Sequence, residues 1–127
     1  MKIEHIALYV TDLESAKTFF ETYFEATSSA KYHNPKTNLQ TYFLTFSEGT
    51  RLELMSRPDM TTRTSELFLT GYTHLAFSLG SKKAVDQLTA HLAADGFQVI
   101  SGPRTTGDGY YESCILGPEG NQIEITV

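Results

Sequence analysis

Residues 3–7 read IEHIA and residues 72–76 read YTHLA, so a short motif with a central histidine occurs twice in the chain. Each copy is followed by a second matching stretch: residues 48–54 read EGTRLEL, and residues 119–125 read EGNQIEI. An internal repeat of this kind indicates one supersecondary unit that is built twice. We therefore predict the fold from a single module and its copy.

Each module is predicted to run β-α-β-β-β. An alternating strand comes first, an amphipathic helix with apolar residues at three- and four-residue spacing follows, and further strands complete the module. The first helix is expected to have Thr11 as its N-cap, in a capping box with Glu14. The second helix is expected to be capped by Ser81 and to end before Gly96. The expected strands are 3–10, 40–46, 51–56, 72–79, 97–100, 110–116 and 121–127, with a variable stretch at 26–39 and a loop at 101–109.

The two modules are expected to make up one α+β domain that spans residues 1–127. Module 1 is placed at about 1–57 and module 2 at about 71–127. The segment between them, 57–70, is polar and irregular but lacks the Gly- and Ser-rich composition of a flexible linker between domains. A chain of 14.2 kDa is also of ordinary size for one domain.

The composition excludes several functional classes. The formal net charge is −5 and the longest basic run is Lys82-Lys83, which argues against a nucleic-acid partner. No apolar stretch approaches the roughly 20 residues of a membrane-spanning helix, and residues 1–10 lack the apolar segment of a signal peptide. We therefore expect a cytoplasmic protein that acts on a small molecule. Cys114 is the only cysteine, so an internal disulfide and a cysteine-rich zinc site are excluded.

Four polar residues recur at matched positions of the two modules. His5 and His74 lie near the start of the first strands, and Glu53 and Glu124 each lie four residues after the glycine of a turn, in the last strands. Each of the four alternates with apolar residues along its strand, so it faces away from the apolar side. Because that apolar side is expected to pack under the helix, all four are predicted to share the opposite face of the sheet.

Two imidazoles and two carboxylates suit a divalent first-row metal such as zinc, nickel, cobalt, iron or manganese. Two carboxylates also cancel the charge of a dication. A lone strand histidine is more often a hydrogen-bonded structural residue, and a lone strand glutamate is usually solvated surface. The recurrence of both residue types at matched positions favours a metal site with His5, Glu53, His74 and Glu124 as ligands.

The remaining candidates have weaker patterns. His33 in the variable stretch and His91 near a helix end are expected to be surface residues. Cys114 is expected to be a buried and inert thiol. The loop at 101–109 is either a lid that offers Arg104 and Tyr110 to a substrate or a plain hairpin loop.

The paired modules, the His/Glu positions and the ending GPEGNQIE at 117–124 resemble the vicinal oxygen chelate superfamily, and within it glyoxalase I (lactoylglutathione lyase) and the bleomycin-resistance proteins. The resemblance covers essentially the whole chain. It implies cup-shaped half-barrels that form a curved sheet of eight strands, with helices on the outer face. It also implies one divalent metal per site, most commonly zinc or nickel. Short members commonly pair as homodimers.

The resemblance further implies a metal-dependent lyase or isomerase, with a small substrate such as an α-ketoaldehyde–thiol adduct that has adjacent oxygens. Glu53 or Glu124 would move a proton between neighbouring carbons of that substrate. The alternatives are an antibiotic-binding or thiol-transfer resistance protein, or another metal-dependent lyase or dioxygenase of the superfamily. The intact ligand set argues against a pure binding protein, because such proteins typically lack it.

The chain departs from small bacterial glyoxalase I enzymes where those enzymes hold glutathione. They carry an arginine four residues after the first ligand histidine and an asparagine four residues after the first ligand glutamate. Those positions are Tyr9 and Arg57 here, which puts glutathione as the thiol in question. Tyr9, Arg57, Arg104 and Tyr110 are the candidate substrate-binding residues.

Overall fold

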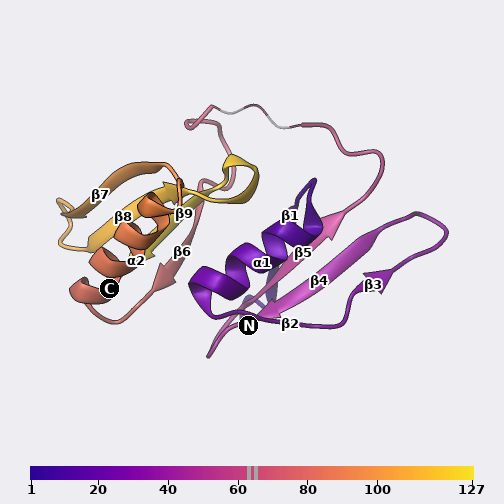
Figure 1. The fold of residues 1–127 in the computed structure, drawn as a ribbon, viewed down its shortest axis with the longest axis horizontal. Coiled ribbons are helices and arrows are strands. Elements are labelled where there is room, and N and C mark those ends of the chain that lie inside the picture. Colours follow the sequence, from indigo (N-terminus) through magenta and orange to yellow (C-terminus); the bar gives the residue numbers. More distant parts are fainter. Residues whose placement is uncertain (63, 65) are drawn as a thin grey trace. The chain divides into compact units, whose positions relative to one another are not determined.

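The computed structural model describes residues 1–62, 64 and 66–127. The chain divides into two compact units, Met1–Arg63 and Thr64–Val127. The boundary between the units lies inside the segment 57–70 that was predicted to join the modules; residues 63 and 65 of that segment lie outside the described residues. Each unit contains one module (Figure 1). The grouping of both modules into one domain stays a prediction.

The first unit is a mixed sheet that packs against one helix (Figure 1). Its strands follow the order β1-β5-β4-β2, and β3 also pairs with β4. β1 and β5 are parallel, whereas β4 and β5 are antiparallel. The elements are β1 (His5–Tyr9), α1 (Leu13–Phe24), β2 (Thr27–Ser28), β3 (Tyr32–His33), β4 (Gln40–Thr45) and β5 (Arg51–Ser56).

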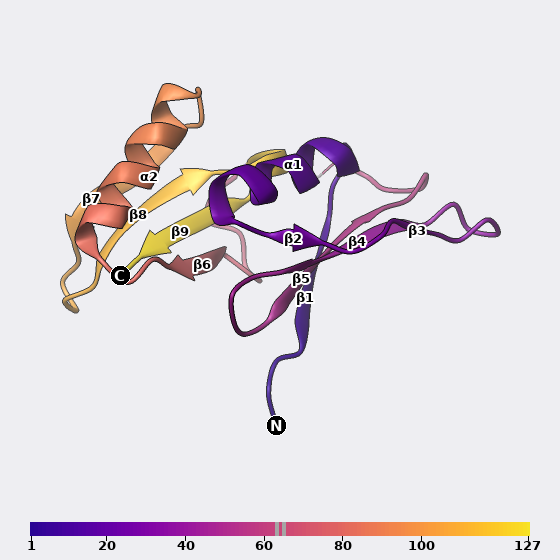
Figure 2. The ribbon, with the colours of Figure 1, turned by 60° about the horizontal axis from the view of Figure 1, so that its bottom comes forward.

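The second unit repeats this plan with one helix, α2, on a sheet whose strands follow the order β6-β9-β8-β7 (Figure 2). β6 and β9 are parallel and match the pair β1 and β5 of the first unit, while β8 is antiparallel to both β7 and β9. The elements are β6 (His74–Ser78), α2 (Lys82–Ala94), β7 (Val99–Thr105), β8 (Tyr111–Leu116), a 3-10 turn (Pro118–Gly120) and β9 (Gln122–Thr126).

The predicted β-α-β-β-β order and the α+β class are confirmed. The first unit differs in one detail, because two short strands, β2 and β3, occupy the stretch 26–39 that was predicted as variable. The described residues therefore contain nine strands, against the seven expected from the sequence pattern and the eight that the resemblance implies. Within the same residues, none of the helices has the length and apolar character needed to cross a membrane.

The predicted loop at 101–109 is wrong in its first half, because β7 continues to Thr105. Glycine and proline in this stretch favour a loop. β7 nevertheless stays paired with β8 as far as Thr105 opposite Tyr111, although the register shifts at two points. Gly102 has a φ of +78°, and a Cβ at this position would collide with the backbone carbonyl oxygen of Glu112. The glycine thus permits a close approach of two strands rather than a break in the sheet.

The helix starts follow local capping chemistry. Asp12 is the N-cap of α1, so the predicted capping box of Thr11 and Glu14 is wrong. The Asp12 carboxylate accepts hydrogen bonds from the backbone N–H of Ser15 at 2.9 Å and from its hydroxyl at 2.7 Å, which explains why the cap lies one residue later. The predicted cap of α2 is confirmed, since the Ser81 hydroxyl oxygen accepts from the Ala84 N–H at 3.2 Å.

The apolar side of each sheet packs under its helix, as the alternation predicted. α1 contributes large aromatic side chains, and α2 contributes smaller aliphatic ones. The helix therefore covers one face of each sheet and leaves the opposite face for polar residues. The buried side chains of the two cores include Leu13, Phe19, Phe20, Phe24, Leu44, Leu52 and Leu54 in the first unit and Val85, Leu92, Ile115, Ile123 and Ile125 in the second.

A buried hydroxyl pair joins α2 to β8. The Thr89 hydroxyl donates to the Val85 carbonyl oxygen at 2.7 Å, and its oxygen lies 2.6 Å from the Ser113 hydroxyl oxygen. A hydroxyl has one hydrogen, so Ser113 must be the donor to Thr89. Both side chains are almost fully buried, with exposures of 3% and 1%.

This direction predicts unequal stability losses. Thr89→Val removes the acceptor and leaves the buried Ser113 hydroxyl without a partner, which is expected to cost about 1–3 kcal/mol. Ser113→Ala leaves the Thr89 donor bond intact and is expected to cost only about 0.5–1.5 kcal/mol. Urea unfolding of the two variants and of the double variant measures the difference. A larger loss for Ser113→Ala would contradict the assigned direction.

Candidate metal centre

In the first unit, the histidine and the glutamate come from the parallel strands β1 and β5. Ala7 lies opposite Glu53, so His5 lies two residues before the register partner of the glutamate and on the same face. Ala7, which lies between the two on this face, has a small side chain. The Nε2 atom of His5 lies 3.9 Å from Oε2 of Glu53.

The second unit repeats this arrangement at the same register. Ala76 lies opposite Glu124 in the parallel pair β6 and β9, and His74 again lies two residues earlier on β6. The Nε2 atom of His74 lies 3.4 Å from Oε2 of Glu124. The structure therefore brings together each predicted His–Glu pair within its own unit.

The two pairs have the same pattern of exposure. The glutamate side chains are 15% and 20% exposed, and the histidine side chains are 40% and 37% exposed. The carboxylates thus lie deeper on the sheet face, whereas the imidazole edges are accessible from outside. This arrangement suits groups that bind a ligand on the sheet face rather than groups that pack into the core.

The donor set fits a divalent metal in its chemistry and its spacing. Adjacent ligands at the usual bond length of about 2.1 Å lie roughly 3–3.5 Å apart, close to the 3.4 Å of the second pair and somewhat less than the 3.9 Å of the first. Within the part of the chain that the structure describes, no three His, Cys, Asp or Glu side chains form a group that could hold a metal ion. Each unit by itself therefore supplies two donors.

His5 contacts charged and aromatic neighbours that the repeat motif did not predict. Its Nδ1 atom lies 2.5 Å from Oε2 of Glu4, and the Nε atom of Arg51 donates to Oε1 of the same glutamate at 2.8 Å. The hydrogen bond to His5 and the nearby Arg51 hold the pKa of Glu4 below its usual value. Arg51 in turn lies over the Phe43 ring, with its guanidinium carbon 4.2 Å from the ring centroid. The adjacency of Glu4 and His5 was the only sequence signal for this cluster.

Glu124 has a different surrounding, which the sequence analysis also missed. Cys114 lies opposite Glu124 in the β8–β9 pair, and Glu112 lies two residues earlier on β8. Burial and the negative charge of Glu124 raise the pKa of Glu112. Burial, followed by the charges of Glu124 and Glu112, raises the pKa of the Cys114 thiol, in accord with the inert thiol that was expected. The side chain is half-buried rather than buried as predicted.

Tyr9 and Arg57, two of the predicted substrate-binding residues, lie together at one end of the β1–β5 pair. Tyr9 is half exposed, and it is among the groups that raise the pKa of Arg57. The Arg57 guanidinium also forms a two-pronged ion pair with Asp59, with Nη2 donating to Oδ2 at 2.7 Å. The hydrogen bonds with Asp59 and then Tyr9 raise the pKa of Arg57. The positive charge of Arg57 is therefore already paired.

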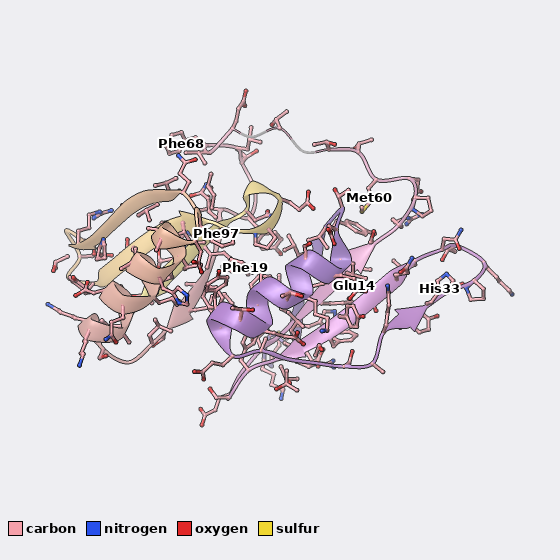
Figure 3. All side chains as sticks on the ribbon, in the orientation of Figure 1. Glu14, Phe19, His33, Met60, Phe68 and Phe97 are labelled. Carbon is pink, nitrogen blue, oxygen red and sulfur yellow. The ribbon has the colours of Figure 1, made fainter. Side chains whose placement is uncertain are left out.

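Arg104 and Tyr110 lie in different parts of the β7–β8 hairpin. Arg104 belongs to β7 and lies 3.9 Å from the carboxylate of Glu112, whereas Tyr110 is an exposed residue of the turn before β8. Arg104 is therefore part of a strand of the β7–β8 hairpin rather than of a loop, and its role as a substrate contact stays a prediction. His33 lies exposed on β3 (Figure 3), and His91 pairs with Asp95 at 3.2 Å, so both are surface residues as predicted.

The comparison with known families agrees with this geometry. The profile of the Glyoxalase/Bleomycin resistance protein/Dioxygenase superfamily matches residues 2–125. The chain belongs to this superfamily. The resemblance inferred from the paired histidines and glutamates is thereby confirmed, and the repeated unit with one helix on one sheet is the fold of the superfamily.

Three individual relatives share between 19% and 27% sequence identity with this chain. The uncharacterized protein YqjT of Bacillus subtilis (strain 168) is 27% identical over 130 residues, which cover 97% of this chain and 96% of that protein. The trypanothione-dependent glyoxalase I of Leishmania major matches 99% of this chain and 86% of its own with a TM-score of 0.79 at 19% identity. A mutant of the fosfomycin resistance protein FosX from Listeria monocytogenes, solved with Mn(II) and a dihydroxypropylphosphonic acid, matches 98% of this chain and 90% of its own with a TM-score of 0.74 at 21% identity. These two structures share the fold.

Proposed function

We propose that the protein is a metal-dependent lyase or isomerase of the glyoxalase I type, which acts on a small α-ketoaldehyde–thiol adduct or a similar substrate with adjacent oxygens. One observation carries this proposal: each unit holds a His–Glu pair in the same strand register, on the sheet face that its helix leaves open. A repeat can copy a structural pair as well, but both pairs here lie on the open face and bring an imidazole nitrogen within 3.9 and 3.4 Å of a carboxylate oxygen. A shared chemical task explains the recurrence.

We propose that His5, Glu53, His74 and Glu124 together hold one divalent metal, because each pair supplies only two of the donors that such an ion needs. Zinc and nickel suit this mixed imidazole and carboxylate set best, with cobalt, manganese and iron as further candidates. When bound, the metal polarises adjacent substrate oxygens as a Lewis acid. The neutral imidazoles and the two carboxylates of the site then leave it close to electrically neutral.

The proton transfer is assigned to a glutamate of this set. Glu53 or Glu124 accepts a proton from one substrate carbon as a general base and returns it to the neighbouring carbon as a general acid. Both carboxylates are mostly shielded, at 15% and 20% exposure, which limits exchange of that proton with water. The repeat makes the two glutamates equivalent in position, so kinetics must distinguish them.

The substrate's thiol part is proposed to lie against Tyr9 and Arg57, with Arg104 and Tyr110 as further contacts. Because Asp59 already neutralises Arg57, a carboxylate of the thiol gains less from this arginine than from an unpaired one. Glutathione, which has two carboxylates, is therefore a poor match for this end of the site. The glyoxalase I of Leishmania major, which shares the fold, depends on trypanothione.

An activity screen tests the proposed function. Protein loaded with nickel, zinc, cobalt or manganese is mixed with methylglyoxal and a set of thiols, and loss of the adduct is followed. We expect turnover with at least one metal, its disappearance after chelation and its return on reloading. Less than about one metal per two chains in protein never exposed to chelator, together with no turnover, would contradict the proposal.

The alternative is a resistance protein of the same fold that binds or modifies an antibiotic. The likeness to FosX, which was solved with Mn(II), is the observation in its favour. Incubation of the manganese-loaded protein with fosfomycin, with and without a thiol, distinguishes the two functions. Consumption of fosfomycin without turnover of any methylglyoxal adduct would favour this alternative.

A further inference from the structure

The two histidines of the repeat differ in what lies behind them. Nδ1 of His5 contacts the Glu4 carboxylate at 2.5 Å, whereas the residue before His74 is Thr73. Within residues 1–62, 64 and 66–127, Glu124 is the only acidic side chain that pairs with the His74 ring. The contact with Glu4 is therefore specific to the first unit.

Glu4 is itself held in place by its neighbours. Arg51, which lies opposite His5 in the β1–β5 register, binds Oε1 of Glu4 through Nε at 2.8 Å and through Nη2 at 2.5 Å. The guanidinium of Arg51 stacks over Phe43, and the His5 ring meets the same phenyl ring edge-on at a centroid distance of 5.5 Å. Three side chains, Glu4, Arg51 and Phe43, therefore hold one another in place around His5.

The second unit lacks this arrangement altogether. Its residues at the positions of Glu4, Arg51 and Phe43 are Thr73, Gln122 and Cys114, as the matching strand registers show. None of these carries a charge that could replace the Glu4–Arg51 pair. The difference follows from three substitutions at matched positions rather than from one.

We propose that Glu4 is a positioning residue that sets the tautomer and orientation of His5. An ionised carboxylate can only accept, so the ring nitrogen that faces it, Nδ1, carries the hydrogen. Nε2, on the side of Glu53, then presents a lone pair to a ligand. Carboxylate partners of this kind fix the ring and raise the basicity of the ligating nitrogen. The role of this lone pair as a metal donor rests on the function proposed above.

The tautomer of His5 in the metal-free protein tests the inference directly. Nitrogen-15 NMR at a pH where the rings are neutral is expected to show His5 protonated at Nδ1 in the unmodified protein. Glu4→Leu removes the acceptor, so His5 is expected to shift toward protonation at Nε2, while His74 in the same spectrum is expected to stay unchanged. Protonation of His5 at Nε2 in the unmodified protein would overturn the inference.

Metal affinity gives a second readout that does not depend on turnover. Glu4→Leu is expected to weaken the affinity for zinc or nickel by about 10- to 100-fold in a chelator competition, and Arg51→Gln by less, because Glu4 then loses only its support. Glu48→Gln, which removes one exposed carboxylate of the same unit, is the matched control and is expected to change affinity less than about twofold. Unchanged affinity in Glu4→Leu would overturn the inference. Absence of metal binding in the unmodified protein would overturn the proposed function, and the tautomer would still decide the role of Glu4.

Discussion

Replacement of Glu53 or of Glu124 by glutamine is expected to lower kcat by about 100-fold or more while the protein still folds. Glutamine keeps the shape of the side chain but loses the negative charge that binds a cation and the oxygen that accepts a proton. Both glutamates lie on the sheet face that the helices leave open, so the cores are not disturbed. Turnover, metal content and thermal unfolding of each variant measure these effects.

The two variants are also expected to differ from each other, because only one glutamate needs to act as the base. The variant of the base is expected to retain more metal than activity, whereas the variant of the other ligand is expected to lose both together. Glu48→Gln, on an exposed turn, controls for the loss of one charge. Normal metal binding and full activity in both variants would show that the site assignment is wrong.

The repeat explains why the candidate site could be predicted from the sequence. A strand alternates its side chains, so the apolar neighbours of Glu53 and Glu124 fix the face on which each glutamate lies. The repeat then places His5 on β1 and His74 on β6 at equivalent positions. Each of these strands is parallel to the strand of its own glutamate, and the structure confirms the same register for both pairs. The His–Glu pattern of one module is a weak signal for a metal site, and its occurrence in both modules makes that signal much stronger.

Features that depend on contacts between distant residues could not be predicted in this way. The β7 strand contains Gly102 and Pro103, whose local preferences favour a loop, yet pairing with β8 keeps the stretch in the sheet. The support of His5 by Arg51 depends on a register between strands that are almost 50 residues apart in the chain. Such contacts follow from tertiary structure, which overrides local propensity.

The helix start shows a competition between two local signals. The residues Thr11 and Glu14 match the sequence pattern of a capping box, but Asp12 with Ser15 offers a carboxylate cap one residue later. Aspartate and threonine are both good caps, and aspartate also gains from the positive end of the helix. The pattern alone did not decide between them.

Assembly of the full ligand set requires that one His–Glu pair meets another. We propose that this happens in a homodimer, because the first sheet ends in β1 on one side and in β2 and β3 on the other, and the second sheet ends in β6 and β7. Open sheet edges are normally paired or covered. A two-fold axis makes such contacts self-complementary. His5 and Glu53 of one chain would then share a metal with His74 and Glu124 of its partner, and metal binding would stabilise the dimer.

Mixing two inactive variants is expected to restore activity if the sites are shared. His5→Ala and His74→Ala should each be inactive, because every site of either homodimer lacks one imidazole. In a mixed dimer, both lesions fall in one site and the other site keeps all four ligands. Random exchange makes half of the dimers mixed, each with one of its two sites intact, so about a quarter of the activity of the unmodified protein should return.

A mixture of His5→Ala with His5→Ala/His74→Ala is the matched control and should stay inactive, because no dimer of that mixture contains a complete site. Absence of recovery despite demonstrated exchange of subunits would show instead that each site is built from one chain, with both of its His–Glu pairs serving the same metal.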